Sequence, residues 1–129
     1  MRKISDLKKE AQKWAYKYLD KIAVYNRYFN NFIEVNKNGI DHTLNSKTIT
    51  EAHILAFYDI KDILFKARYM GNEEPRHNQL NIIKIHIFST NKIIKGIKYQ
   101  VRIIVREVSV NSKEKNRHFF YDHSIIEKV

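Results

Sequence analysis

The side chains in this sequence best suited to chemistry are six histidines and the tyrosine, arginine and lysine residues placed among them. The chain has no cysteine, which excludes thiolate zinc sites and cysteine nucleophiles. It also lacks a glycine-rich phosphate loop, a serine nucleophile elbow and the HExxH spacing of zinc proteases. Acidic residues are scattered singly along the predicted sheet, which disfavours a two-metal nuclease because that mechanism needs several convergent carboxylates. We therefore expect neither a metal site nor a cofactor.

Histidine, tyrosine, arginine and lysine suit the cleavage of RNA by attack of its own 2′-hydroxyl on the adjacent phosphate. The substrate supplies the nucleophile, so the protein needs only a base, an acid and positive charge near the phosphate. None of these roles requires a metal. The residue types therefore predict a metal-independent endoribonuclease.

The predicted strand over residues 118–126 carries a tyrosine and a histidine that could act together. Alternation of side chains along a strand places Phe119, Tyr121 and His123 on one face and Asp122 on the other. Tyr121 and His123 would then offer a general acid and a hydrogen-bond donor side by side. Core packing of the aromatic residues next to a solvated His123 explains the same pattern.

Arg102 stands inside the apolar run Val101–Val105, where a guanidinium is costly to desolvate unless it is paired or faces a ligand. An ion pair with Glu34 or Glu107 is one explanation. A two-pronged contact to a phosphate is the other, because guanidinium geometry matches phosphate oxygens. We assign Arg102, with His42, Tyr121 and His123, to the catalytic group. Substrate binding is assigned to Thr43, His53, Lys84 and Arg106.

The other histidines allow both structural and functional interpretations. His42 follows the predicted turn at residues 36–39, where a strand end would expose it, and a polar turn residue is equally consistent. His53 lies on the predicted buried stripe of a helix, so it is at least as consistent with a hydrogen-bonded core histidine as with a functional one. His86 is expected on a solvated sheet surface, and His77 in a loop.

The charge of the chain indicates a polyanionic partner. The 129 residues carry 24 basic and 14 acidic side chains, a net charge of +10. So strong a positive balance on a small protein is typical of nucleic-acid binding, and less often of binding to a membrane surface. No uncharged apolar run approaches the roughly 18–20 residues of a membrane span, and the N-terminal residues lack the apolar region of a secretory signal. We expect a soluble protein of the cytoplasm with RNA as its partner and no membrane association.

Periodicity predicts an α+β fold with the order α-β-β-α-β-β-β. Apolar residues three and four apart predict a first helix over residues 4–19. Two short strands, 22–28 and 31–35, are expected to form a hairpin, followed by an Asn-rich turn at residues 36–39. Three later strands in hairpin succession favour an antiparallel sheet, with the middle one central; their predicted ranges are 80–89, 98–110 and 118–126.

A second helix is predicted over about residues 49–70. Thr48 and Glu51 fit a capping box at its start, and Gly71 supplies a C-terminal stop. A polar loop at residues 71–79 and a polar turn at residues 111–117 separate the later strands. No repeat or linker composition divides the chain, so we expect residues 1–129 to form one domain.

Several segments together resemble the phage-associated nuclease domains of the barnase–EndoU–colicin–RelE-like group and the related domains of large polyvalent phage proteins. The resemblance spans roughly residues 5–127 and implies a barnase- or RelE-like fold, with helices packed on an antiparallel sheet. It also implies an endoribonuclease or toxin activity. By position, His42, Arg102, Tyr121 and His123 match the family's functional elements. The segments that carry it are Ile40–Thr43, His53, Ala67–Tyr69, Tyr99–Glu107 and Phe120–His123.

Three functions remain open at this point. The first is a metal-independent endoribonuclease with toxin-like action, delivered to a target cell as part of a larger polypeptide or acting where it is made. The second is a non-catalytic nucleic-acid-binding accessory domain of a phage or mobile element, and the third is a structural or interaction module. A basic active site would be neutralised naturally by an acidic immunity or antitoxin protein as partner.

Overall fold

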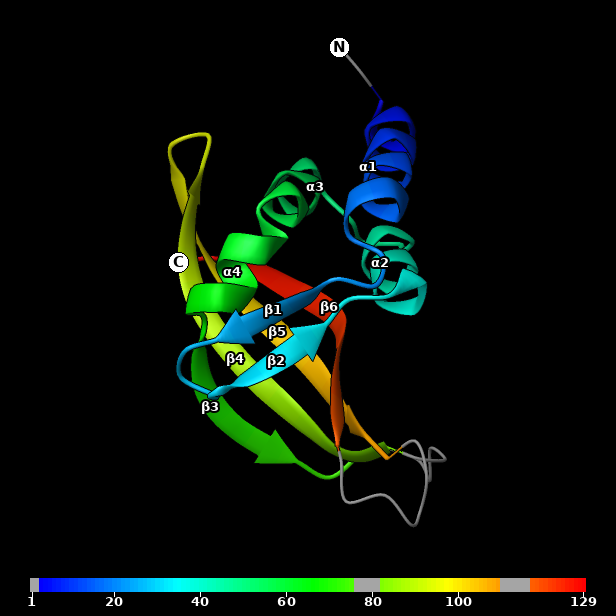
Figure 1. Ribbon diagram of the computed structural model, residues 1–129. Helices are drawn as coiled ribbons and strands as arrows, with labels where there is room; N and C mark the ends of the chain where they lie inside the picture. The colour runs from blue at the N-terminus through cyan, green and yellow to red at the C-terminus, as the bar shows by residue number, and fades with distance from the viewer. Residues whose placement is uncertain (1–2, 76–81, 110–116) are drawn as a thin grey trace.

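The computed structural model describes residues 3–75, 82–109 and 117–129. Four helices and six strands form a curled sheet with helices packed against it (Figure 1). The helices are α1 (Ile4–Tyr18), α2 (Lys37–Leu44), α3 (Glu51–Tyr58) and α4 (Ile60–Lys66). The strands are β1 (Ala23–Asn26), β2 (Asn31–Glu34), β3 (Arg68–Glu73), β4 (Ile82–Ile94), β5 (Ile97–Val108) and β6 (His118–Lys128).

The sheet has the strand order β1-β2-β6-β5-β4-β3. Neighbouring strands pair antiparallel, with one exception: β2 and β6 run parallel and pair at Glu34 and Phe120. Along the remainder of that edge, from Tyr121 onward, no described strand lies beside β6. The α+β class is therefore confirmed, and the strand predicted as central, β5, lies between β6 and β4.

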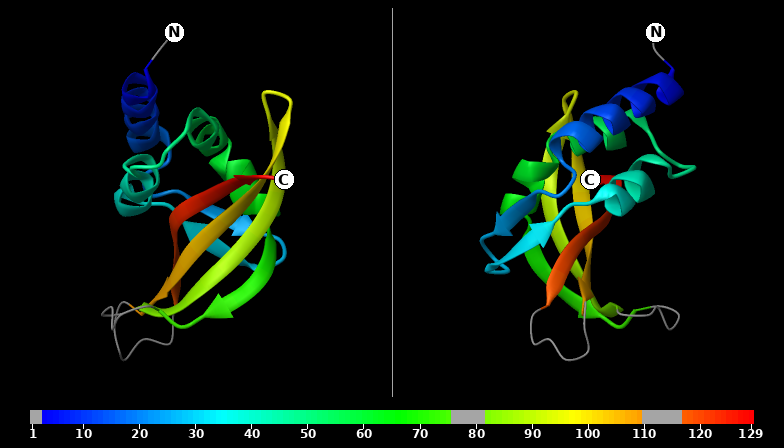
Figure 2. Two further views of the ribbon diagram at one scale, coloured as in Figure 1. Left: turned by 180° about the vertical axis from the view of Figure 1, so that it is seen from behind. Right: turned by 45° about the vertical axis from the view of Figure 1, so that its right-hand side comes forward.

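The core fills the space between the concave side of the sheet, the helices and the β1–β2 hairpin. Seen from behind, the long strands β4 to β6 have none of the described helices in front of them (Figure 2). Alternation along β5 sends Val101, Ile103 and Val105 into this core, while Arg102 between them is exposed. None of the described helices is long and apolar enough to cross a membrane.

The predicted helix over residues 49–70 is wrong in extent. The chain forms two short helices, with Asp59 ending α3 and preceding α4, and then enters β3 at Arg68. Gly71 does not stop a helix: it sits in β3 at a register irregularity, with a φ of +132° that suits glycine. Pairing with β4 overrides the helical pattern of this segment because it satisfies its backbone groups in the sheet.

The predicted turn at residues 36–39 is also wrong, because these residues begin α2. Asn36 caps the helix, its side-chain oxygen accepting a hydrogen bond from the backbone N–H of Gly39. Asn36 therefore acts at a helix start, a role for which asparagine is as well suited as for a turn. His42 accordingly lies in the last turn of a helix and not at a strand end.

The solvated position predicted for His86 is wrong. The residue is 6% exposed. Its Nε2 lies 2.7 Å from Glu107 Oε1, and its Nδ1 lies 2.8 Å from the Tyr69 hydroxyl. Phe29 and Phe119 pack against the ring, so His86 belongs to the aromatic end of the core. Burial is tolerated because both ring nitrogens have partners.

The other elements agree with the sequence more closely. The first helix, the early hairpin and the three later strands are confirmed, with ends displaced by up to five residues. The final part of the predicted loop at 71–79, which holds His77, and nearly all of the predicted turn at 111–117 lie outside the described residues.

Candidate functional site

A bulge in β6 brings two neighbouring polar side chains to the same side of the sheet. Val105 of β5 pairs with Tyr121, but the preceding residue of β5, Ile104, pairs with His123, so Asp122 is the extra residue. Such a bulge interrupts the alternation of side chains. Tyr121 points into the core, whereas Asp122 and His123 are both partly exposed and bonded to each other. The prediction that Tyr121 and His123 share a face is therefore wrong, because alternation assumed an unbroken strand.

Helix α2 packs against β6 at this bulge because it has a glycine where the backbones meet. A Cβ added at Gly39 would lie 2.2 Å from the carbonyl oxygen of Tyr121 and 3.1 Å from Cδ2 of its ring. No side chain fits in that space. The close approach places His42, three residues later on the helix, above Asp122 and His123.

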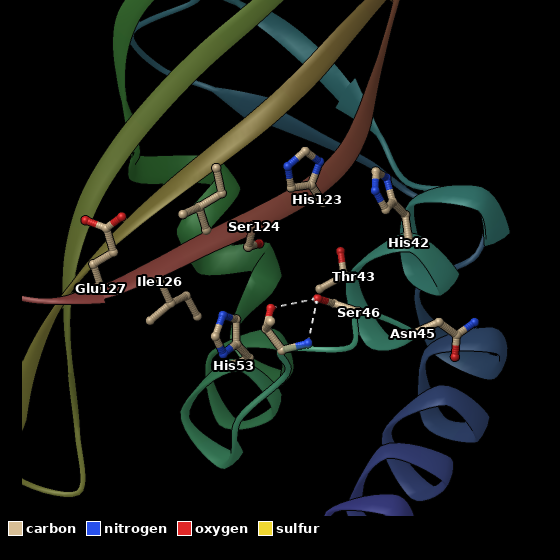
Figure 3. Close-up of a pocket in the computed structure, with 11 residues that line it drawn as sticks. His42, Thr43, Asn45, Ser46, His53, His123, Ser124, Ile126 and Glu127 are labelled. Atoms are coloured by element: carbon tan, nitrogen blue, oxygen red, sulfur yellow. Dashed lines mark hydrogen bonds between the residues drawn. The ribbon is translucent and has the colours of Figure 1, made fainter.

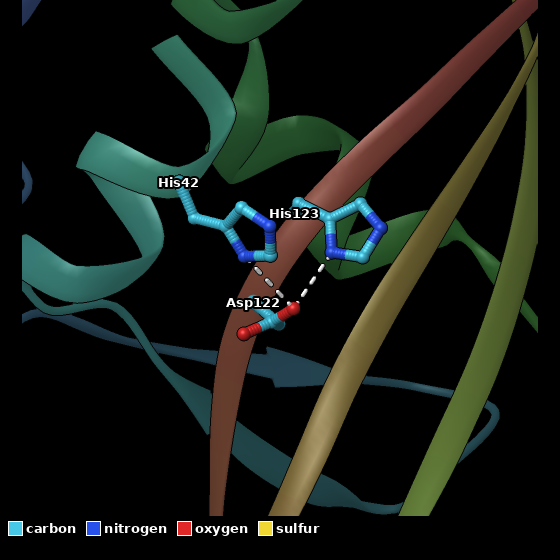
Figure 4. A group of neighbouring side chains, drawn as sticks. All are labelled: His42, Asp122 and His123. Atoms are coloured by element: carbon cyan, nitrogen blue, oxygen red, sulfur yellow. Dashed lines mark hydrogen bonds and ion pairs between the residues drawn. The ribbon is translucent and has the colours of Figure 1, made fainter. Parts of the chain in front are cut away.

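A hydrogen bond from His123 and an ion pair with His42 join both histidines to Asp122 (Figure 4). Oδ2 of Asp122 lies 2.7 Å from Nδ1 of His123 and 3.1 Å from Nδ1 of His42. The centroids of the two imidazole rings are 4.6 Å apart, at an interplanar angle of 46°. Both rings turn their second nitrogen, Nε2, away from the carboxylate. We call these three residues the His–Asp–His cluster.

Arg106 holds the other oxygen of the same carboxylate. Its Nε lies 3.1 Å from Asp122 Oδ1, in a partly buried ion pair. This Nε is buried and makes no hydrogen bond within the described part of the chain, so the contact is one of charge rather than of aligned N–H donation. Arg106, assigned to substrate binding from the sequence, thus contacts the cluster through Asp122.

The positive groups around Asp122 keep its carboxylate ionised. Burial raises the pKa of Asp122, but the hydrogen bond from His123 lowers it, as do the charges of His42 and Arg106. The net result is a pKa below the usual value. An ionised carboxylate can only accept hydrogen bonds, so the Nδ1 that His123 turns toward it carries a hydrogen, and at 3.1 Å the negative charge favours a hydrogen on Nδ1 of His42 as well. Nε2 is then the nitrogen on each ring available for acid–base work.

The cluster stands at one end of an open cavity of about 610 Å³ between α2, α3 and the unpaired edge of β6 (Figure 3). His42 and His123 lie at this end, and His53 lies across the cavity on α3. Hydroxyl and amide side chains lie between them, and Ile125 and Ile126 of β6 add apolar surface to the wall. Three of the six histidines therefore line one cavity; its other lining residues include Thr43, Asn45, Ser46, Thr48, Ser124 and Glu127.

His53 has a structural partner that the sequence did not suggest. The capping box at the start of α3 is built from Thr50 and His53, not from the predicted Thr48 and Glu51. The Thr50 hydroxyl lies 2.7 Å from His53 Nδ1, and the Thr50 backbone N–H donates to the same nitrogen. His53 is partly exposed rather than in the core, and partial burial lowers its pKa.

Tyr121 is fully buried beneath the cavity. Its hydroxyl lies 2.7 Å from Thr43 Oγ1 and 2.6 Å from Ser124 Oγ, and burial raises its pKa to about 12. Thr43 also donates to the backbone carbonyl of Gly39. These hydrogen bonds hold α2 against β6, so Tyr121 and Thr43 stabilise the arrangement of the two elements that carry the cluster.

Arg102 and Lys84 lie outside the cluster. Arg102 is exposed and pairs with Ile125, two residues beyond His123 along β6. The proposed partners Glu34 and Glu107 instead contact His118 and His86. Lys84 lies on β4, where its ammonium group contacts Asn72 and Glu74. Of the eight residues singled out from the sequence, the structure brings His42, His123 and Arg106 around one carboxylate.

That carboxylate, Asp122, is the residue of the candidate site that the sequence does not single out. Its sequence pattern makes it one of the scattered acidic residues and places it on the face opposite His123. Only its position directly before His123 signalled a connection, and the bulge that turns both outward has no clear sequence mark. The three ligand atoms of the cluster lie within 4.8 Å of one another, a spacing that a metal ion could bridge.

Comparison with known families matches residues 2–121 to the family model described as Large polyvalent protein-associated domain 3. The chain belongs to this family. Large polyvalent protein-associated domain 3 is a domain of large polyvalent phage proteins, as one part of the sequence resemblance implied. The match covers α1 to β5 and reaches Tyr121, one residue before Asp122. No curated protein and no solved structure matches the chain.

Proposed function

We propose that this domain is an endoribonuclease that cleaves RNA through attack of the 2′-hydroxyl, with His42 and His123 as its acid–base pair. The observation that carries the proposal is the shared carboxylate: one oxygen of Asp122 contacts both Nδ1 atoms. A carboxylate that fixes a histidine tautomer is the arrangement by which enzymes prepare an imidazole for proton transfer. Here a single carboxylate prepares two.

The reaction needs two proton transfers around one phosphate group. One imidazole accepts the proton of the 2′-hydroxyl while the new bond from O2′ to phosphorus forms. The other donates a proton to the 5′-oxygen while the old phosphorus–oxygen bond breaks. Both oxygens belong to the same phosphodiester, so acid and base must lie close together, as rings 4.6 Å apart do.

Positive charge near the cluster supports binding of the phosphate. The chain carries a net charge of +10, and Arg102 is exposed on β5 beside the part of β6 that follows His123. A guanidinium there could bind a phosphate with two hydrogen bonds. Tyr121 takes no part in the proposed reaction, because its buried hydroxyl is bonded to Thr43 and Ser124. Arg106 acts as a positioning residue that holds Asp122.

The test is RNA cleavage by His42→Ala and His123→Ala. Each change should lower the rate by about 10²–10⁴-fold, the usual contribution of a general acid or base. His118→Ala is the matched control, because His118 also lies against a carboxylate, with Nδ1 2.9 Å from Glu34 Oε2, but outside the cluster. It should cut RNA at the parent rate. Melting temperatures of the three variants verify that they fold.

Products and substrates test the mechanism itself. Cleavage should persist in excess chelator, leave a 2′,3′-cyclic phosphate and fail on RNA carrying a 2′-deoxy residue at the scissile position. Parent-rate cleavage by both His42→Ala and His123→Ala would refute the assignment of the acid–base pair. Salt-sensitive RNA binding with no cleavage by the parent protein would instead support the accessory-domain function.

A further inference from the structure

We infer that the His–Asp–His cluster also binds a single transition-metal ion of the Zn²⁺ type, and that this ion silences the acid–base pair. The second part rests on the proposed function, whereas the first does not. His42 Nδ1, His123 Nδ1 and a carboxylate oxygen of Asp122 are all ligand atoms that Zn²⁺ accepts. They come from a helix and a strand about eighty residues apart, joined only by the fold.

The distances suit an ion after a small adjustment. With bonds of about 2.0–2.2 Å, ligand atoms around a tetrahedral zinc ion stand about 3.3 Å apart. Asp122 Oδ2 lies 2.7 Å from one Nδ1 and 3.1 Å from the other, and all three ligand atoms lie within 4.8 Å of one another. His42 is 57% exposed at its side chain, so its ring has room to shift and bring the three ligand atoms to that spacing.

The surroundings of Asp122 favour coordination through one oxygen. Arg106 engages Oδ1, which leaves Oδ2 directed at the two imidazoles. The cavity beside His42 and His123 leaves the fourth coordination position open to water. Three protein ligands with one open position are the composition of many zinc sites in enzymes. The nearby guanidinium charge opposes the cation, so binding should be reversible.

Metal binding at Nδ1 would remove the base from the proposed reaction. In the metal-free cluster each Nδ1 carries a hydrogen, and the lone pair of a neutral ring lies on Nε2. A metal takes the Nδ1 lone pair, so a neutral ring must carry its hydrogen on Nε2. Neither His42 nor His123 could then accept the proton of a 2′-hydroxyl. The imidazolium that serves as acid needs hydrogens on both ring nitrogens, so a metal on Nδ1 excludes it as well, and one ion blocks both halves of the pair.

Binding is tested with the metal alone, without RNA. Chelator-treated protein is titrated with Zn²⁺ by calorimetry and with Co²⁺ by visible absorption, which reports tetrahedral coordination. We expect one ion per chain, and affinities reduced at least about tenfold in His42→Ala, His123→Ala and Asp122→Asn. His118→Ala, which removes a histidine from another carboxylate pair, should bind like the parent. Absence of one-to-one binding, or binding by His42→Ala and His123→Ala with the affinity of the parent, would overturn the site.

Silencing is tested separately by adding Zn²⁺ to the cleavage reaction. RNA cleavage should fall with the same concentration dependence as metal binding and return when chelator is added. Cleavage that persists at saturating Zn²⁺ would overturn the silencing and leave the acid–base pair intact. Stimulation by Zn²⁺, with no cleavage in chelator, would overturn both silencing and the metal-independent reaction. Failure of metal binding with normal cleavage in chelator would overturn the metal site alone.

Discussion

Replacing Gly39 by alanine should disassemble the cluster from a distance. In an ordinary helix this change adds stability, by about 0.5–1 kcal/mol, because glycine loses more chain entropy on folding. In α2 the new Cβ would lie 2.2 Å from the Tyr121 carbonyl oxygen, which belongs to the backbone of β6 and cannot rotate away. The helix and the strand must therefore separate by about 1 Å to restore an ordinary contact.

The magnitude follows from two opposing contributions. Overpacking of a well-packed interface costs about 1–3 kcal/mol, and contact with backbone places this site at the upper end of that range. After subtraction of the helix preference, the free energy of unfolding should fall by about 2–2.5 kcal/mol. For a chain of 129 residues the melting temperature should fall by roughly 7–9 °C.

The displacement should reach the site because His42 moves with α2. Its Nδ1 lies 3.1 Å from Asp122 Oδ2, so a shift of about 1 Å breaks this ion-pair contact. We expect Gly39→Ala to lose RNA cleavage and Zn²⁺ binding at temperatures where it is fully folded. Gly96→Ala is the control: its φ of +78° makes alanine strained, but no atom lies within 4 Å of the added Cβ. It should lose stability and keep both activities.

Thermal unfolding followed by circular dichroism measures the stability of both variants. Cleavage and metal titration are then carried out about 20 °C below the lower melting temperature, where both variants are folded. The two measurements separate a loss of stability from a loss of the cluster. A Gly39→Ala protein that is as stable as the parent would refute the steric argument. A destabilised Gly39→Ala protein with parent-like cleavage and metal binding would refute the coupling between the α2–β6 contact and the cluster.

Three further outcomes are expected. Burial raises the pKa of Tyr121 in the folded protein to about 12 from 10.0. Its contribution to the free energy of unfolding is therefore complete below pH 10 and is lost as the pH rises toward 12. Tyr121→Phe should remove this pH-dependent loss, on the order of 2 kcal/mol, as measured by urea unfolding at pH 8 and 11.5. His86→Leu removes the hydrogen bonds to Tyr69 and Glu107, so the free energy of unfolding should fall by about 1–3 kcal/mol while RNA cleavage stays unchanged. Loss of cleavage in this variant would place His86 and Glu107 in the reaction. Arg102→Ala should weaken RNA binding and reduce the slope of log affinity against log salt by about 1, and an unchanged slope would exclude a phosphate contact there.

The sequence determined the kinds of structure and the chemistry available. Periods of three to four residues marked α1, and runs of β-branched and aromatic residues marked the hairpin and the three later strands. Net charge pointed to a polyanion, and the absence of cysteine confined the ligand and acid–base chemistry largely to histidine. His42 and His123 were singled out from these facts, because residue type and rough element boundaries suffice to nominate a polar group.

Local signals failed wherever a distant segment decided the outcome. The stretch from Arg68 to Gly71 has a helical pattern, but it becomes β3 because β4 offers it a hydrogen-bonding edge. Asn36 is compatible with a turn or a helix cap, and packing of α2 on β6 selects the cap. His86 is polar, yet it is buried because Tyr69 and Glu107 satisfy its ring. In each case a tertiary partner outweighs a propensity of at most about 1 kcal/mol.

The site itself was decided by tertiary structure. A one-residue bulge directly after Tyr121 turned His123 away from the core to the side of Asp122, and the bulge depends on the register between β5 and β6. In the sequence Gly39 looks like a turn residue. Only the structure shows that α2 can pack here because Gly39 has no Cβ to clash with the carbonyl oxygen of Tyr121. His42 meets Asp122 across about eighty residues of chain. Spacing along a sequence encodes which side chains share an element, whereas hydrogen bonding between elements decides which side chains share a site.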